Sequence, residues 1–280
     1  MLSIKEQIKN IGRLLYYGPK IETKANISYL APSKQLTGKK IIITGGGKGI
    51  GKAMATKFVS EGAEVLIAGR NEQNLKIEAE KLNCHYLLLD VQDVDCFETF
   101  INKADKLLNG ANCLVNNAGI SLHEQNFTDV TPQTFDSQFN TNLRGCFFLT
   151  QKFYKLLSEN KREGNILFLS SETGNTVDIR PYGLTKAAIN SFVKGLASLT
   201  VNQGIRVNGL APGITASEMT GVKADGNLYY PGNIINRIYL PEEIAQCACF
   251  LLSDASGCIS GEILTCNNGK TINSRWKSFK

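Results

Sequence analysis

Short apolar runs alternate with longer segments of helical periodicity from Lys39 onward. Runs such as Val65-Leu66-Ile67 are apolar at consecutive positions, which is typical of strands buried on both faces of a parallel sheet. Alternating strands and helices require crossover connections that place helices on both faces. The pattern therefore predicts an α/β fold built on a parallel sheet. The expected strands are 40–44, 64–68, 85–89, 112–116, 164–170, 204–210 and 262–266, and the expected helices are 50–61, 71–82, 94–109, 132–159, 182–202 and 241–253.

Residues 1–38 form a basic N-terminal extension ahead of a single domain over 39–280. Apolar residues recur at helical spacing between Ile4 and Leu15, beside a row of basic residues, which predicts a short amphipathic helix. Either this stripe packs on the protein's own body or a sister subunit, or it contacts an acidic membrane surface or acidic partner. The first alternative is favoured, and residues 19–38 are expected to be a linker.

The composition indicates one large domain. The chain has 280 residues, 42% of them hydrophobic, which is enough to bury a substantial core. It lacks an apolar run long enough for a bilayer and the features of a signal peptide, so we expect a cytoplasmic protein. Eight cysteines are scattered without metal-ligand spacing, so no metal site is expected.

The net charge of +6 belongs to one end of the chain. Residues 1–40 hold eight basic and two acidic residues, so the remaining 240 residues carry no net charge. A balanced body does not indicate a nucleic-acid-binding surface.

A glycine-rich turn follows the first expected strand. The stretch Thr44-Gly45-Gly46-Gly47-Lys48-Gly49-Ile50-Gly51 joins that strand to a helix. Glycines allow a sharp turn and a close approach by a diphosphate, which the N–H groups at the start of the helix would face. An ordinary loop is the alternative, since such a motif alone is weak.

The end of the second expected strand bears on the choice of cofactor. An acidic residue usually holds the ribose 2′-hydroxyl of NAD there, whereas this chain has Gly69-Arg70-Asn71. Arg70 can pair with a 2′-phosphate, and Lys48 can reach the same group. Each alone is equally a solvated surface charge, but together they favour NADP(H).

Polar and small residues follow the next two strands. Asp90-Val91 follows the third, where the carboxylate either accepts a bond from the adenine amino group or caps a helix. Asn116-Asn117-Ala118-Gly119 follows the fourth. Its small residues allow close approach of the cofactor ribose, and its amides can tie neighbouring strands.

A tyrosine and a lysine begin the long helix after the fifth strand. Tyr182 and Lys186 are four positions apart, so they share one helical face. A phenol with a pKa near ~10 is a poor base at neutral pH. A neighbouring ammonium group and a cationic nicotinamide would lower that pKa and make the phenol a usable proton donor and acceptor. A pair of surface residues is the alternative.

Taken together, these motifs closely resemble the short-chain dehydrogenase/reductase family, in its NADP-preferring, 3-oxoacyl-reductase-like (ketoreductase) form. The resemblance covers roughly residues 38–270. It rests on the order of the glycine turn, Asn116-Asn-Ala-Gly119, Asn142-Leu-Arg-Gly145, Ser171, Tyr182-x-x-x-Lys186 and Arg206-Val-Asn-Gly-Leu-Ala-Pro-Gly213.

This resemblance implies a Rossmann-type doubly wound fold with a seven-stranded parallel sheet. It implies that Tyr182 is the general acid or base, that Lys186 lowers its pKa and holds the ribose, and that Ser171 binds the substrate oxygen. Asn142 would hold a water that links Lys186 to solvent. The residues expected to bind the cofactor are Thr44, Gly45, Gly47, Lys48, Gly49, Ile50, Gly51, Arg70, Asn71, Asp90, Val91, Asn117, Ala118, Gly119, Tyr182, Lys186, Pro212, Gly213 and Thr215.

The chain departs from the family pattern near the substrate. Ser171 precedes Tyr182 by 11 residues, about two fewer than expected, so either Ser170 or Ser171 faces the substrate, with Ser171 favoured. Residues 213–240 stand where a mobile lid is usual. Met219, Leu228, Tyr229 and Tyr230 either form a pocket wall or pack an ordered loop.

The expected function is NADP(H)-dependent hydride transfer to or from a ketone, aldehyde or secondary alcohol. The alternative is a cofactor-binding sensor or scaffold without turnover, and a nucleotide-sugar epimerase is disfavoured by the glycine spacing. The resemblance also implies a homodimer or homotetramer joined through the helices 132–159 and 182–202. The sequence does not identify the small-molecule carbonyl or alcohol.

Overall fold

The computed structural model describes residues 5, 21–25 and 33–272. The helix expected between Ile4 and Leu15 lies outside these residues, apart from Lys5. The other expected elements all fall within them.

A single parallel sheet forms the centre of the molecule, as predicted. Its seven strands are ordered β3-β2-β1-β4-β5-β6-β7. Consecutive strands step outward on both sides of the β1–β4 pair, which is the arrangement of a doubly wound fold. The strands are β1 (Lys40–Thr44), β2 (Glu64–Gly69), β3 (His85–Leu88), β4 (Cys113–Asn116), β5 (Gly164–Leu169), β6 (Ile205–Pro212) and β7 (Ile263–Cys266).

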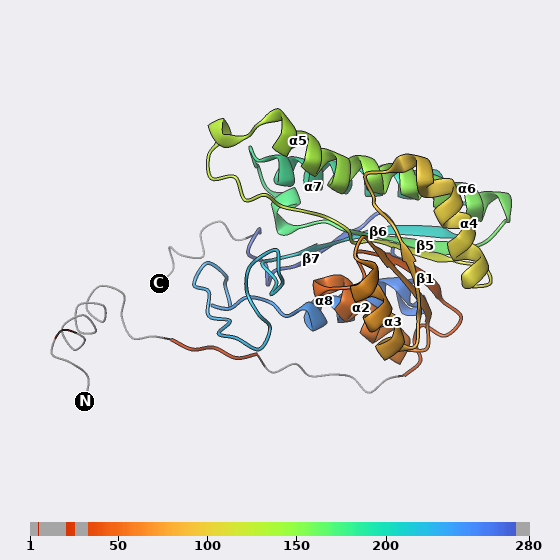
Figure 1. Cartoon of the computed structure of the whole chain (residues 1–280), viewed down its shortest axis with the longest axis horizontal. Helices are drawn as coiled ribbons and strands as arrows, with labels where there is room; N and C mark the ends of the chain where they lie inside the picture. The colour runs from red at the N-terminus through yellow and green to blue at the C-terminus, as the bar shows by residue number, and fades with distance from the viewer. Residues whose placement is uncertain (1–4, 6–20, 26–32, 273–280) are drawn as a thin grey trace.

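Helices cover both faces of the sheet (Figure 1). α4, α5, α6 and α7 lie on one face, and α2, α3 and α8 lie on the other. The confirmed fold is therefore a single-domain, Rossmann-type α/β fold. The helices are α2 (Gly49–Ser60), α3 (Glu72–Leu82), α4 (Phe97–Leu107), α5 (Pro132–Phe139), α6 (Cys146–Glu159), α7 (Pro181–Thr200) and α8 (Pro241–Leu252).

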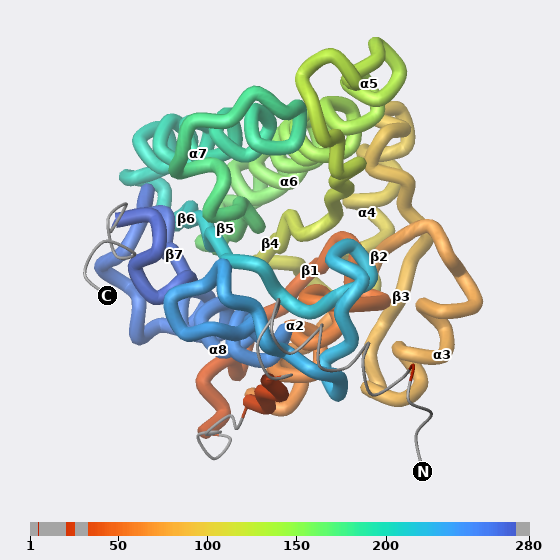
Figure 2. The backbone as a smooth tube through the Cα atoms, turned by 90° about the vertical axis from the view of Figure 1, so that its left-hand side faces the viewer, coloured from red at the N-terminus to blue at the C-terminus, as the bar shows by residue number. Residues whose placement is uncertain are grey.

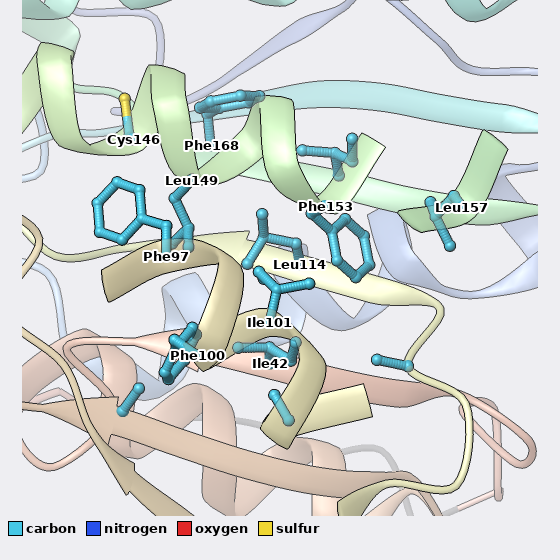
Figure 3. Packing of buried hydrophobic residues seen from close by; sticks show 14 of the residues in the cluster. Ile42, Phe97, Phe100, Ile101, Leu114, Cys146, Leu149, Phe153, Leu157 and Phe168 are labelled. Atoms are coloured by element: carbon cyan, nitrogen blue, oxygen red, sulfur yellow. The ribbon is translucent and has the colours of Figure 1, made fainter. Parts of the chain in front are cut away.

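The sheet separates two apolar cores. On one face, Phe97 and Ile101 of α4 and Phe153 of α6 pack onto Ile42 and Leu114 of the sheet (Figure 3). The other core lies under α2, α3 and α8. Because alternate side chains of each strand enter opposite cores, the central strands are apolar at nearly every position.

The expected helix over 132–159 is interrupted. A π-helical turn over Asn140–Gly145 separates α5 from α6. Gly145 lies so close to the loop after β3 that a Cβ there would be 2.0 Å from the carbonyl oxygen of Val91. The wider turn therefore accompanies a close approach between this helix and Val91, and it places Asn142 inside the protein.

The expected linker over 19–38 is only partly correct. Leu36 is fully buried in the core beneath α2. The buried carboxylate of Glu61 accepts the N–H groups of Ser33 and Gln35 at 3.1 and 3.2 Å. Residues 33–38 therefore pack as part of the domain.

The segment between β6 and α8 lies beside the carboxyl ends of the strands (Figure 2). Leu228 is buried there with Ala216, Ile238 and Leu240, so it packs an ordered segment. Met219 and Tyr230 are exposed. Residues 21–25 lie alongside this segment, with Leu228 N–H donating to Thr23 O at 3.1 Å and Thr23 N–H donating to Asn227 Oδ1 at 3.0 Å.

Candidate active site

The glycine turn joins β1 to α2 at the carboxyl edge of the sheet. Gly45 and Gly49 have φ angles of +65° and +52°, which favour glycine. A Cβ on Gly51 would lie 2.2 Å from Gly45 O, so only glycine fits this packing. The first turn of α2 has neither a side-chain cap nor an acidic residue, which leaves its N–H groups available to a phosphate.

Thr44 and Asn117 lock this turn to the end of β4. Thr44 Oγ1 accepts the N–H groups of Asn117 and Ala118 at 3.1 and 3.0 Å. The Asn117 amide donates to Thr44 O at 2.8 Å and to Gly45 O at 3.1 Å. Asn116 donates to Thr150 of α6 at 2.8 Å. The expectation that these amides tie neighbouring strands is confirmed for Asn117, which joins β4 to β1, whereas Asn116 joins β4 to a helix.

The two cations proposed for the 2′-phosphate have different surroundings. Lys48 forms an ion pair with Glu218, from the segment between β6 and α8, and both side chains are exposed. Arg70 is exposed and forms no ion pair or hydrogen bond with the described residues. Arg70 is therefore the cation that is free to meet an incoming phosphate.

Asn71 and Asn74 position the loop beside Arg70. Asn71 caps α3 by accepting the N–H of Asn74 at 2.9 Å. The Asn74 amide donates to Gly47 O at 2.8 Å. Sequence analysis missed Asn74, because its only signal is its position three residues after a helix cap.

Asp90 is exposed and Val91 is buried at the end of β3. Asp90 Oδ1 accepts the N–H of Gln92 at 2.9 Å, and Asp93, not Asp90, stands at the N-cap position of the helical turn that follows. The alternative of Asp90 as a helix cap is therefore wrong. The carboxylate closes a turn that keeps Val91 against Gly145.

Ser171 and Tyr182 meet beyond the carboxyl end of β5. Their side chains are hydrogen-bonded to each other. Ser170 instead donates to Asn190 Oδ1 at 2.5 Å and is buried. Of the two serines, Ser171 is thus the one beside Tyr182. Its hydroxyl also accepts the N–H of Thr173 at 3.3 Å.

Lys186 is buried one helical turn beyond Tyr182. Its ammonium donates to Leu169 O at 2.6 Å and lies 5.5 Å from the centre of the Tyr182 ring. Burial lowers the pKa of Lys186 from 10.5 to about 8. Burial also raises the pKa of Tyr182, and the hydrogen bond with Ser171 lowers it only in part. The expected lowering of the Tyr182 pKa includes the charge of a bound nicotinamide and stays a prediction.

Asn142 is 1% exposed and holds the loop after β4. Its amide donates to Ile120 O at 2.8 Å and its Oδ1 accepts the Ile120 N–H at 2.8 Å. A Cβ on Gly119 would lie 3.3 Å from Asn142 Oδ1 and 3.8 Å from Lys186 Nζ. Asn142, Gly119 and Lys186 therefore adjoin one another.

The end of β6 forms the remaining wall of the candidate site. Gly213 N–H donates to Cys266 O at 2.9 Å, and a Cβ on Gly213 would lie 2.7 Å from the Tyr239 ring. Thr215 is buried and donates to Gly213 O at 2.9 Å. This wall follows Pro212 at the same edge of the sheet as the glycine turn.

Another network missed by sequence analysis adjoins Ser171. Glu172 is buried and pairs with Lys270 at 2.7 Å. It also accepts the Asn267 amide at 3.1 Å. These contacts attach the chain after β7 to the Ser171 turn.

The site fits a dinucleotide cofactor. Gly45, Gly51 and Gly119 lack side chains where a Cβ would meet backbone or polar atoms, so glycine allows the tight packing of the turn that such a cofactor site needs. Uncapped N–H groups stand at one end of this edge, and Tyr182 with Lys186 stands at the other.

Within residues 5, 21–25 and 33–272, no group of His, Cys, Asp or Glu side chains is arranged to hold a metal ion. None of the helices in these ranges has the length and apolarity that crossing a membrane requires.

Known proteins resemble this chain over most of its length. Residues 45–271 match a family model described as enoyl-(acyl carrier protein) reductase. The chain is 30% identical over 245 residues to 3-oxoacyl-[acyl-carrier-protein] reductase of Aquifex aeolicus, covering 84% of this chain and 98% of that protein. It is 31% identical over 249 residues to L-rhamnose 1-dehydrogenase (NADP(+)) of Thermoplasma acidophilum, covering 84% and 97%.

A solved structure extends this similarity to three dimensions. 3-Ketoacyl-(acyl-carrier-protein) reductase from Brucella melitensis, complexed with NADH, has a TM-score of 0.79 and 28% identity. The match covers 84% of this chain and 99% of that one.

The buried Lys186 predicts a pH-dependent stability. Below pH 8 both the folded and the unfolded states hold the Lys186 proton, and the folded state carries the full cost of burying the charge. Between pH 8 and 10.5 the unfolded state binds more protons, so this cost, on the order of 3 kcal/mol, is progressively relieved. The Tm of the wild type minus that of Lys186→Met should therefore rise between about pH 8 and 9.5 in differential scanning calorimetry.

The exposed Lys194 on the same helix supplies the control. The Tm difference between wild type and Lys194→Met should stay constant over this range. A constant difference for Lys186→Met as well would contradict the lowered pKa of Lys186.

Proposed function

Because this chain belongs to the short-chain dehydrogenase/reductase family, whose members are hydride-transferring oxidoreductases acting on CH–OH donors, we propose that it is an NADP(H)-dependent enzyme for a ketone, aldehyde or secondary alcohol, with Tyr182 as its general acid and base. One observation carries the proposal. Tyr182, Ser171 and Lys186 converge at the sheet edge that also holds the glycine turn.

The proton-transfer chemistry follows from this arrangement. The bound nicotinamide supplies or accepts the hydride. In reduction, the Tyr182 phenol donates its proton to the substrate oxygen, and the Ser171 hydroxyl hydrogen-bonds the same oxygen as charge develops. In oxidation, Tyr182 receives the proton.

Lys186 and Asn142 support Tyr182. With its pKa at about 8, Lys186 is still mostly charged at pH 7, and its positive charge stabilises a phenolate at Tyr182. Asn142 fixes Ile120 and thereby the Gly119 backbone next to Lys186. The expected proton relay through a water at Asn142 stays a prediction.

The preference for NADP(H) rests on Arg70, with Lys48 in support. A guanidinium can make two parallel charge-assisted hydrogen bonds to a phosphate. Lys48 has to leave Glu218 to join it, but an exposed ion pair of this kind contributes only ~0–1 kcal/mol and is readily exchanged. The relatives do not decide this choice, because one is named for NADP(+) and a solved structure contains NADH.

A homodimer or homotetramer in the cytoplasm completes the proposal. Phe147 and Phe148 of α6 and Leu184 and Leu199 of α7 are exposed apolar side chains on the layer formed by these helices. A second copy would cover such a surface. Multi-angle light scattering should give at least twice the 30.6 kDa mass of one chain. A single species at that mass would contradict the assembly.

Removing one oxygen atom tests the role of Tyr182. In Tyr182→Phe the ring that faces Lys186 remains, so the Kd for NADPH should change less than about twofold. Turnover should fall by about 10²- to 10⁴-fold, the usual contribution of a general acid or base. The measurement is NADPH absorbance with the best substrate from a screen of ketones, aldehydes and secondary alcohols.

Tyr154→Phe, on α6, is the matched control and should retain activity. Retained turnover in Tyr182→Phe would refute the mechanism. NADPH binding by the wild type without turnover on any compound would instead support the sensor alternative.

Arg70 and Lys48 predict tighter binding of NADPH than of NADH. Arg70→Ala should weaken NADPH binding by about 10- to 100-fold and leave NADH binding unchanged, because a charge-assisted bond is worth ~1.5–3 kcal/mol. Glu218→Gln should strengthen NADPH binding by freeing Lys48. Fluorescence titration measures all of these dissociation constants.

Lys76→Ala, an exposed charge on α3, controls for general electrostatics. Equal wild-type dissociation constants for the two cofactors would show that the phosphate assignment is wrong.

A further inference from the structure

A cavity lies beside the segment that leads into Tyr182. It has a volume of about 270 Å³ and is lined by residues 123–127, from the loop after β4, and by Ile179 and Arg180, which precede Tyr182. His123 Nε2 lies 2.7 Å from Met219 O, so the segment between β6 and α8 borders the same loop. The cavity is therefore bounded by two loops at the carboxyl edge of the sheet.

Glu124 presents an unpaired acceptor in this loop. Its Oε1 accepts the Gln138 amide at 2.6 Å, and the fully buried Gln138 accepts the Leu122 N–H at 3.3 Å. These bonds fix the carboxylate. Its Oε2 is buried and has no hydrogen-bond partner among the described residues. A buried acceptor in this position is stabilised when a ligand supplies a donor.

Arg180 presents a donor on the opposite loop. Its Nε and Nη2 bind the Asp178 carboxylate at 2.9 and 2.7 Å, while its Nη1 has no partner within the described ranges. The Asp178 side chain is only 8% exposed, and its Oδ2 lies 2.4 Å from where a Cβ on Gly183 would be, so this carboxylate holds the guanidinium in place. The hydrogen bonds that Arg180 donates to Asp178, and to a lesser extent the charge of Glu124, raise the pKa of Arg180.

The charges and the size of the cavity restrict its ligand. Glu124 and Asp178 outnumber Arg180 by one negative charge, which disfavours a phosphate- or carboxylate-bearing ligand. A volume of about 270 Å³ lies at the small end of ligand pockets, which is too little for a long acyl chain. A hydroxyl group both donates and accepts, so neighbouring hydroxyls can satisfy Glu124 and Arg180 together.

We propose that this cavity is the subsite for the hydroxyl-bearing part of a neutral, polyhydroxylated substrate, a sugar or sugar alcohol. Glu124 Oε2 accepts a hydrogen bond from one hydroxyl, and Arg180 Nη1 donates one to a neighbouring hydroxyl. Phe127 and Ile179 supply apolar surface for the C–H groups of the same ligand. The inference rests on the proposed function, since the reacting carbon lies at Tyr182.

Binding and turnover test the subsite separately. Ligand-observed NMR on Tyr182→Phe with NADPH detects binding without turnover. The probes are neutral aldohexoses and 6-deoxyaldohexoses, gluconate and glucose 6-phosphate as anionic analogues, an acetoacetyl thioester of N-acetylcysteamine, and cyclohexanone. We expect binding of at least one neutral sugar and none of the anionic analogues. In the wild type, kcat/KM for that sugar should exceed that for cyclohexanol by at least about 100-fold.

Glu124→Gln should raise KM for the sugar by about 10- to 100-fold, with kcat and the rate on cyclohexanol nearly unchanged, since the loss concerns binding. Arg180→Gln should act in the same direction. Glu80→Gln, an exposed carboxylate on α3, is the matched control and should leave KM unchanged.

The outcomes separate the two proposals. Turnover of cyclohexanone or the thioester without sugar binding would overturn the subsite and leave the proposed function intact. Sugar binding that Glu124→Gln abolishes, with no turnover of any probe, would support the subsite and refute the proposed function. A KM unchanged in both Glu124→Gln and Arg180→Gln would overturn the subsite.

Discussion

The pairing of β1 with β4 is the constraint on which the rest of the site depends. Strands step outward from this pair in both directions, so the chain connections diverge there and leave room beyond the carboxyl ends. Thr44 and Asn117 join the two strand ends through side-chain to backbone bonds. These bonds satisfy the polar backbone of the glycine turn without bulky side chains, which keeps its surface open to a diphosphate.

Burial determines the pKa values of Lys186 and Tyr182, which lie at the same carboxyl edge of the sheet as the glycine turn. Both Lys186 and Tyr182 lose water on folding, which favours a neutral amine and a neutral phenol. A buried phenol gives up its proton less readily, and the positive charge of Lys186 stabilises the phenolate that remains after the proton has left. The site holds both groups close together on one turn of α7, so the cost of burying Lys186 is linked to the chemistry proposed for Tyr182.

The sequence predicted the features that depend on local patterns. All seven strands were found, because buried parallel strands are apolar at consecutive positions, and the glycine turn was recognised by its spacing. The break between α5 and α6 was missed, because it accompanies contact between Gly145 and Val91, which are far apart in the chain. The ion pair between Lys48 and Glu218 and the hydrogen bond that Gln138 donates to Glu124 were missed for the same reason. Asn142 was anticipated only through the family resemblance, since nothing in its helical neighbourhood marks it.

The ion pair between Lys48 and Glu218 joins the glycine turn to the segment between β6 and α8. Glu218 belongs to the segment between β6 and α8, which also contacts residues 21–25 and the loop at His123. Both charges are exposed, so their pairing contributes little to stability and exchanges easily for a stronger partner. A dianionic 2′-phosphate is such a partner, and its binding would release Glu218 from the glycine turn. The same segment contacts His123, which lines the cavity proposed as a substrate subsite, so release of Glu218 would act on the chain next to that cavity.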